Sequence, residues 1–180
     1  DLSYETGFAG VGGTVKYLKH IWGVRGYYPI VSDDFVLKGT AETGVMQKMG
    51  KTIRIVDSFT MGYTNLRGFD FQGIGPRDKA TRDPLNGTRM WRASIELKFP
   101  SGLPEDWKIS ASVFNDWGCL WAPGQKDSNT QDDRKIRAAA GVGVLWTSPF
   151  GPIGVTYAVP YMSQKYDEKR SVQLQFSNLF

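Results

Sequence analysis

One stretch decides the fold class of this chain: Trp91-Arg92-Ala93-Ser94-Ile95-Glu96-Leu97-Lys98-Phe99. Its odd-numbered residues are apolar or aromatic, and its even-numbered residues are polar or charged. Because successive side chains of a β-strand point to opposite faces, the stretch predicts a strand with one apolar and one polar face. A helix would instead repeat its apolar positions every three or four residues.

The same alternation recurs on both sides of this stretch and predicts an all-β, antiparallel protein. Further clear examples are the segment from Trp107 to Asp116, the segment from Ile136 to Thr147 and the last ten residues. The segment 14–30 matches the alternation least well, because its polar residues Lys16, His20 and Arg25 fall on both faces. Strands are therefore expected over residues 1–9, 14–30, 34–46, 87–99, 107–121, 134–148, 152–160 and 171–179.

Alternation alone fits a soluble β-sandwich as well as a membrane barrel. Two further features favour the barrel. The apolar faces end in aromatic residues, as the girdles at two membrane interfaces require, and short connections alternate with longer ones. The girdle candidates are Trp91, Phe99, Trp107, Trp121 and Trp146, and the residues expected to contact lipid are Trp91, Ile95, Val113, Val142, Val144 and Leu174.

Composition excludes several other classes. No run of 18 apolar residues exists, so a membrane-spanning helix is excluded. The net charge of +4 is spread along the chain, which argues against a nucleic-acid partner. With the single residues Cys119 and His20, neither a disulfide, a zinc site nor a serine triad can be built, so we expect no enzyme activity and no cofactor.

The connection over residues 47–86 is the longest, and structureless segments of this length are uncommon in compact domains. It contains Phe59, Phe69, Phe71 and Ile74, which makes it too apolar for a disordered tail. We therefore expect a loop that folds back and packs against the sheet.

Motifs in that loop and after it resemble those of the BamA family of outer-membrane proteins. Leu66-Arg67-Gly68-Phe69, with the downstream Gly75-Pro76-Arg77, is similar to the family's [VIL]-R-G-[FY] loop motif. Further similar segments follow in family order: Ser94–Pro100, Phe114–Gly118, Gly141–Pro152 and the terminal strand Val172–Phe180, which ends in an aromatic residue.

The resemblance implies a fold and a place within a larger protein. Such a barrel has sixteen strands, so residues 1–180 would be about its last eight, forming the C-terminal part of the barrel with the long loop folded inward. The periplasmic repeats of the family, the POTRA domains, are absent from the sequence. The chain opens at Asp1 without a signal peptide, which suggests an excised piece of a longer precursor.

Two acidic residues have the parity needed to face the loop from the wall. Glu96 and Asp116 both fall on the polar faces of neighbouring strands, and a guanidinium can satisfy two carboxylates at once. The resemblance implies that Arg67 is this guanidinium. In this interpretation Gly68 permits close backbone approach and Phe69 packs on the inner wall.

The resemblance also implies a function. The chain would belong to an assembly factor that folds and inserts β-barrel proteins into the Gram-negative outer membrane, with a lateral seam beside the terminal strand. Its partners would be unfolded barrel clients, outer-membrane lipid and, through the POTRA domains, the lipoproteins of an assembly complex. The terminal strand residues expected to serve as the signal are Val172, Leu174, Phe176 and Phe180.

The nearest alternative is a sibling of the same superfamily, either a TamA-like translocation factor or a two-partner secretion transporter, since these share the loop motif. The segment Trp146–Pro152 favours the assembly factor. A small structural or porin-like barrel fits the loop motif poorly, and a soluble β-sandwich binding module fits it less well still.

Overall fold

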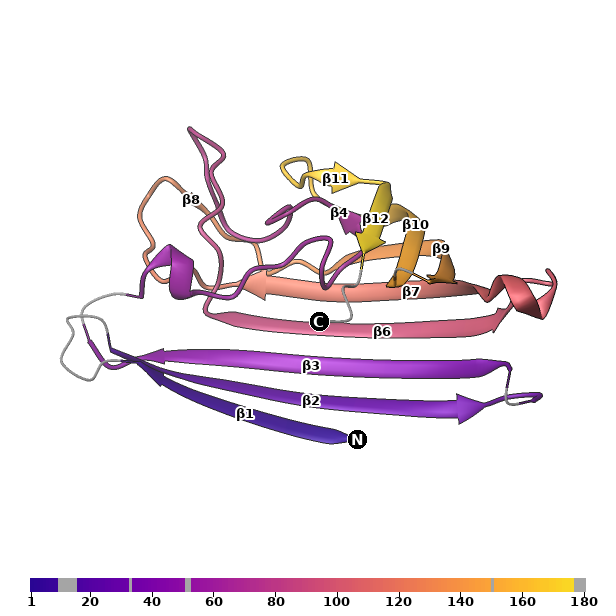
Figure 1. Ribbon diagram of the computed structural model, residues 1–180. Coiled ribbons are helices and arrows are strands. Elements are labelled where there is room, and N and C mark those ends of the chain that lie inside the picture. Colours follow the sequence, from indigo (N-terminus) through magenta and orange to yellow (C-terminus); the bar gives the residue numbers. More distant parts are fainter. Residues whose placement is uncertain (10–15, 33, 51–52, 150, 177–180) are drawn as a thin grey trace.

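The computed structural model describes residues 1–9, 16–32, 34–50, 53–149 and 151–176. Eight strands form one antiparallel sheet in the order β1-β2-β3-β6-β7-β9-β10-β12, so each pairs with its neighbours along the chain (Figure 1). These strands are β1 (Leu2–Ala9), β2 (Tyr17–Pro29), β3 (Val36–Lys48), β6 (Arg89–Pro100), β7 (Ile109–Trp121), β9 (Arg137–Ser148), β10 (Gly151–Met162) and β12 (Val172–Phe176). All eight expected strands are therefore present, and the all-β prediction is confirmed.

The strand register divides the sheet into two faces, as the alternation predicted. Leu97 lies opposite Val113, and Val113 lies opposite Val142, so apolar residues continue across β6, β7 and β9 on one face. We call this the outer face. Ile95, Val142 and Leu174 on it are 50%, 51% and 61% exposed, which is the exposure expected of side chains that another medium covers. The inner face carries Arg92, Ser94, Glu96 and Asp116.

Several expected strand starts lie two or three residues too early, and two of them follow a residue with positive φ. The strand expected from 107 begins at Ile109, because Lys108 has a φ of 49° and interrupts the extended backbone. Trp107 instead ends a short 3-10 helix, η2 (Glu105–Trp107). The strand expected from 134 begins at Arg137, because Arg134 has a φ of 47°.

The long loop joins β3 to β6 and packs on the inner face, as expected. Its bounds shift from 47–86 to 49–88, since β3 extends to Lys48 and β6 begins at Arg89. It contains the 3-10 helix η1 (Ile55–Asp57) and two short strands, β4 (Gly68–Phe69) and β5 (Arg77–Asp78). The buried core lies between this loop and the sheet: Met46, Ile53, Phe59, Met61, Leu66, Phe69, Ile74, Met90, Leu120 and Ala139.

Three loops gather on one side of the sheet and form what we call the cap: 49–88, 122–136 and 163–171 (Figure 1). They are joined by two short antiparallel pairings that alternation did not predict. β5 pairs with β8 (Thr130–Gln131), and β4 pairs with β11 (Lys169–Arg170). The long loop is thus fixed to both of the other loops by backbone hydrogen bonds.

Candidate functional site

The loop arginine and the wall carboxylates meet on the inner face. Arg67 Nε donates to Asp116 Oδ2 at 2.7 Å and Nη2 donates to Asp116 Oδ1 at 2.8 Å, which is the two-bond geometry of a guanidinium on a carboxylate. The backbone N–H of Arg67 also donates to Asp116 Oδ2, at 3.2 Å. One carboxylate of β7 therefore holds both the side chain and the backbone of the loop residue. We call this group, with its neighbours below, the seat.

Glu96 and Ser94 of β6 complete the polar part of the seat. Arg67 Nη1 lies 3.4 Å from Glu96 Oε1, and Nη2 donates to the Ser94 hydroxyl at 3.2 Å. The Ser94 hydroxyl in turn donates to Asp116 Oδ1 at 2.6 Å. The guanidinium thus bridges the two carboxylates that the sequence placed on one face, and each of its three nitrogens has an acceptor within 3.4 Å.

Phe114 supplies a platform beneath the charge. The guanidinium carbon of Arg67 lies 3.4 Å from the Phe114 ring centroid, a cation–π contact in which the ring face attracts the cation. Phe114 is on the same strand as Asp116 and has the same parity, so both reach the inner face. Gly141 leaves the ring its space, because a Cβ there would lie 2.6 Å from Phe114 Cζ.

The electrostatics of the seat favour a permanent ion pair. Burial alone would lower the pKa of Arg67, but the hydrogen bonds and charge of Asp116, with the charge of Glu96, outweigh it and raise the pKa above its ordinary value. The Asp116 side chain is 4% exposed, so its charge depends on Arg67 and Ser94 for partners. Such an arrangement anchors a loop.

The other motif residues bury the loop against the wall. Leu66 and Phe69 are fully buried and belong to the core under the loop. Gly68 has a φ of +90°, and a Cβ there would lie 3.1 Å from Ala139 Cβ and 3.2 Å from Pro160 Cγ. A side chain at this position would both strain the backbone and push against the wall, so glycine is required.

The terminal strand β12 forms one edge of the sheet and pairs only with β10 in the described part of the chain. Val172 and Leu174 pair with the outer-face residues Tyr157 and Val155. Ala158 N–H donates to Ser171 C=O at 2.8 Å, which marks a hydrogen-bonded pair. Because such pairs alternate, the N–H and C=O groups of Val172, Leu174 and Phe176 point away from β10, toward the free edge. Phe180 lies outside the described residues.

The profile of the Omp85 superfamily domain matches residues 1–180, the whole chain. The chain belongs to the Omp85 superfamily.

Relatives narrow the resemblance within Omp85. The outer membrane protein assembly factor BamA of Neorickettsia risticii is 30% identical over 167 residues, which are 92% of this chain and 22% of that protein. BamA of Neisseria meningitidis serogroup B is 24% identical over 196 residues, which are 94% of this chain and 24% of that protein. The chain thus spans less than a quarter of the length of these curated relatives.

A solved structure gives the same result for the fold. The crystal structure of BamA from Haemophilus ducreyi lacking POTRA domains 1-3 superposes with a TM-score of 0.76 and 26% identity, covering 88% of this chain and 34% of that one. The expected membership of the BamA family, and the expected antiparallel barrel fold, are confirmed. None of the helices in the described parts of the Omp85 chain is long and apolar enough to cross a bilayer.

The remaining candidates of the sequence lie apart from the seat. The His20 ring is 2.8 Å from the Tyr4 hydroxyl and stacks beside Trp22, in the first two strands. Cys119 is buried in β7. Among the described residues, no three His, Cys, Asp or Glu side chains are grouped as a metal ion would need.

Sequence reasoning missed two parts of the Omp85 chain. Phe114 lies in the motif Phe114–Gly118, but the contact with Arg67 was not predicted, although the parity of Phe114 with Asp116 indicates it. A fully buried arginine, Arg137, lies at the cap end of β9 with Asp133, Tyr166 and Asp167 around it. Its partners lie in loops without a periodic pattern, so no local signal indicated them.

Proposed function

We propose that the chain forms part of the barrel wall of an outer-membrane protein that folds and inserts other β-barrel proteins into the Gram-negative outer membrane. The observation that carries this proposal is the terminal strand. The backbone groups of Val172, Leu174 and Phe176 point away from β10 and meet no further strand among the described residues, and the side chains of the same residues lie on the outer face.

A strand edge of this kind is unfavourable in lipid, and this favours its pairing with an incoming strand. Each unpaired backbone group in a bilayer costs several kcal/mol, so an exposed edge favours pairing with another strand. An unfolded barrel client carries strands that need the same partners, and it can add to the edge by β-augmentation. The edge would template the first client strand, and the side chains on the outer face would contact the surrounding lipid.

The seat has a separate role in this proposal. It holds the long loop on the inner face, where the loop packs against the other two loops of the cap, so that the edge strand borders an ordered wall. Arg67, Glu96 and Asp116 would act mechanically, since their groups are used to satisfy one another. Accessory lipoproteins of an assembly complex would be reached through POTRA domains and not through the residues of this chain.

The names of the relatives support the assembly role over transport or secretion. Two matched proteins and the superposed structure are called BamA, and the first two are named as outer membrane protein assembly factors. The proposal therefore extends to this chain an activity named for proteins that contain a similar segment.

A backbone-specific variant tests the proposal. Leu174→Pro removes an N–H that faces the free edge and leaves the hydrogen bonds to β10 in place, because proline is tolerated where the N–H is unpaired. Leu174→Ala keeps the N–H and shortens the same side chain. The protein in its complete natural length is placed in liposomes, and folding of an added test barrel is followed by its shifted mobility on unheated gels.

We expect Leu174→Pro to slow client folding at least about tenfold, the equivalent of one lost backbone hydrogen bond near lipid, and Leu174→Ala to retain most activity. Equal rates for the two variants would show that the free backbone edge is not the template. A wild-type protein that accelerates no client would overturn the assembly role itself.

A further inference from the structure

The terminal strand begins directly after a loop that is tied to the rest of the chain. Within the described residues β12 pairs with β10 from Val172 to Phe176. Where the strand begins therefore depends on the loop that precedes it, residues 163–171, and on what that loop contacts.

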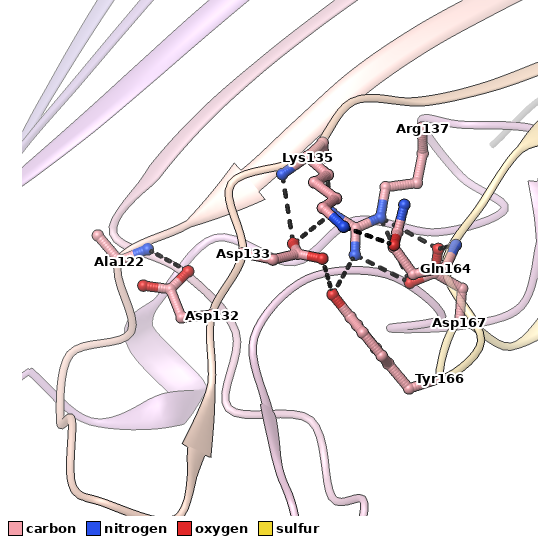
Figure 2. Close-up of polar contacts among 8 residues, drawn as sticks. All are labelled: Ala122, Asp132, Asp133, Lys135, Arg137, Gln164, Tyr166 and Asp167. Atoms are coloured by element: carbon pink, nitrogen blue, oxygen red, sulfur yellow. Dashed lines mark hydrogen bonds and ion pairs between the residues drawn. The ribbon is translucent and has the colours of Figure 1, made fainter.

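The first contact of this loop is a fully buried ion pair. The side chains of Arg137 and Asp167 are both 0% exposed, with Arg137 Nε 3.1 Å from Asp167 Oδ2 and Nη2 3.1 Å from Oδ1 (Figure 2). Arg137 is the first residue of strand β9 and pairs with Gly118 of β7, so it is fixed to the sheet. Asp167 is thus tied to the wall across thirty residues of sequence.

Neighbouring groups satisfy the rest of this ion pair. Arg137 Nη1 donates to Asp133 Oδ1 at 3.1 Å and to Lys135 C=O at 2.7 Å, and Nη2 donates to the Tyr166 hydroxyl at 3.0 Å. The Tyr166 hydroxyl donates in turn to Asp133, and the Gln164 N–H donates to Asp167 Oδ2 at 2.6 Å. Figure 2 shows these side chains converging on the guanidinium from the two loops. Every nitrogen of the Arg137 guanidinium is used.

The second contact comes from the next residue of the same loop. Arg77 of the long loop is buried, and its Nη1 donates to Glu168 Oε1 at 2.9 Å. The Glu168 backbone joins the same loop, since its N–H donates to Gly73 C=O at 2.8 Å and its C=O accepts from Asp70 N–H at 2.9 Å. Asp167 and Glu168 are consecutive, yet they bind arginines from different parts of the chain.

The two contacts differ in strength. Glu168 is 57% exposed on its side chain, and Arg77 Nε is buried without a hydrogen-bond partner among the described residues. The Arg77 pair is therefore partly screened by water and incompletely satisfied. The Arg137 pair is dry and complete, so losing Asp167 would strand a buried cation with a single remaining carboxylate, Asp133.

We propose that Arg137 and Arg77 are positioning residues for the terminal strand, acting through Asp167 and Glu168. We call these two ion pairs the clasp. Only four residues separate Asp167 from Val172, and two of them, Lys169 and Arg170, pair with the motif residues Phe69 and Gly68. The clasp therefore sets where β12 begins and how readily its first pairs with β10 open.

This inference rests on the proposed function for its consequence, because a positioned edge matters to a client that pairs with it. It does not rest on that function for its test, because the position of β12 can be measured without a client. Release of the clasp would free the start of β12 while the seat and the remaining strands stay in place.

Hydrogen exchange tests the clasp directly. The protein in its complete natural length is placed in lipid nanodiscs, and exchange is followed by mass spectrometry in peptides that cover β12 and, separately, β6 and β7. Asp167→Asn keeps the shape and removes the charge, and Glu168→Gln does the same for the weaker pair. Arg170→Gln is the matched control, since Arg170 lies in the same loop and its 3.6 Å ion pair with Asp70 is about half exposed on both sides.

We expect Asp167→Asn to speed exchange in β12 about tenfold or more, Glu168→Gln to speed it less, and Arg170→Gln to leave it unchanged. Exchange in β6 and β7 should not change, since a positioning role confines the effect to β12. The clasp would be overturned if β12 exchanged at the wild-type rate in both Asp167→Asn and Glu168→Gln. It would also be overturned if exchange rose uniformly across the whole sheet.

Client folding measured on the same samples separates the two proposals. A clasp variant with a faster-exchanging β12 and an altered rate of client folding supports both. Should the wild-type protein fold no client while the exchange results hold, the proposed function fails and the clasp stands. Should β12 exchange stay unchanged in an active protein, the clasp alone fails. If Asp167→Asn does not fold, Glu168→Gln, which touches the half-exposed pair, decides the question.

Discussion

Replacing Arg67 by lysine isolates the geometry of the seat from its charge. Lysine keeps the positive charge but offers a point donor in place of a planar fork. In the structure the fork makes two bonds to Asp116, at 2.7 and 2.8 Å, reaches Ser94 at 3.2 Å and lies over the Phe114 ring, 3.4 Å from its centroid. An ammonium group can keep one bond to Asp116 and cannot keep the rest.

The expected loss can be estimated from these contacts. One charge-assisted hydrogen bond contributes about 1.5–3 kcal/mol and the bond to Ser94 about 1 kcal/mol. The stacked contact adds about 0.5–1 kcal/mol, and the residual charge and relaxation of the site offset part of the total. We therefore expect Arg67→Lys to lower the free energy of local loop opening by about 2–4 kcal/mol without unfolding the sheet.

Amide exchange in the loop measures this quantity. Leu66 N–H donates to Gly62 C=O at 2.7 Å and Arg67 N–H donates to Asp116, so both amides exchange only when the seat opens. The predicted loss corresponds to about 30- to 900-fold faster exchange at these amides. Arg54→Lys is the control, because Arg54 lies in the same loop at the same 2.7 Å from a carboxylate, that of Asp57, but is largely exposed.

The reasoning would be refuted by an Arg67→Lys protein whose Leu66 and Arg67 amides exchange at the wild-type rate. It would also be refuted if Arg54→Lys had an equally large effect at these two amides, because charge in the loop, and not the fork, would then be responsible.

Three further predictions concern the wall and the cap. Val142→Arg on the outer face should destabilise the folded barrel in lipid by about 2–4 kcal/mol in reversible unfolding, whereas Ser112→Arg on the inner face of the neighbouring strand should be tolerated. Gly141→Ala should cost about 1–3 kcal/mol in the same assay, because its Cβ would lie 2.2 Å from Tyr157 C=O and 2.6 Å from Phe114 Cζ, and a normal stability would refute this close approach. Acid should weaken the cap through Asp133: burial raises the pKa of this carboxyl, but the hydrogen bond from Tyr166 and the charge of Arg137 lower it overall. Its stabilisation is therefore present above about pH 4 and is lost as the pH falls through the lowered value, so the thermal stabilities of wild type and Asp133→Asn should converge in acid.

The sequence predicted what depends on local alternation. Period two placed Glu96 and Asp116 on one face of adjacent strands, and the structure brings both to Arg67. The same rule placed Ile95 and Val142 on the outer face, where they are half exposed. These positions follow from the pleat of each strand, so they need no knowledge of distant contacts.

Strand ends and the cap could not be predicted in this way. Lys108 and Arg134 adopt positive φ angles, which are uncommon for residues of their type. Neither is a residue that favours turns, so the sequence does not indicate these breaks in the strands. The Arg137–Asp167 pair joins a strand to a loop thirty residues away. From the alternation alone, Arg137 is one of several polar residues on the inner face, with nothing to indicate this partner. Its burial depends on two loops whose course alternation does not describe.

The chemical difference between the seat and the clasp indicates which part of the wall moves. The seat combines an ion pair with fully buried Leu66 and Phe69, and exposing those apolar side chains to the wet interior would cost about 1.5–3 kcal/mol each. The clasp consists of charges, which regain water when they separate, so much of what is lost on opening is recovered by hydration. An opening at the terminal strand should therefore break the Arg137–Asp167 pair and leave Phe69 buried. A fluorescent or spin probe beside Phe69 should report no change while β12 exchanges faster; simultaneous release of both would show that the loop and the edge strand move as one body.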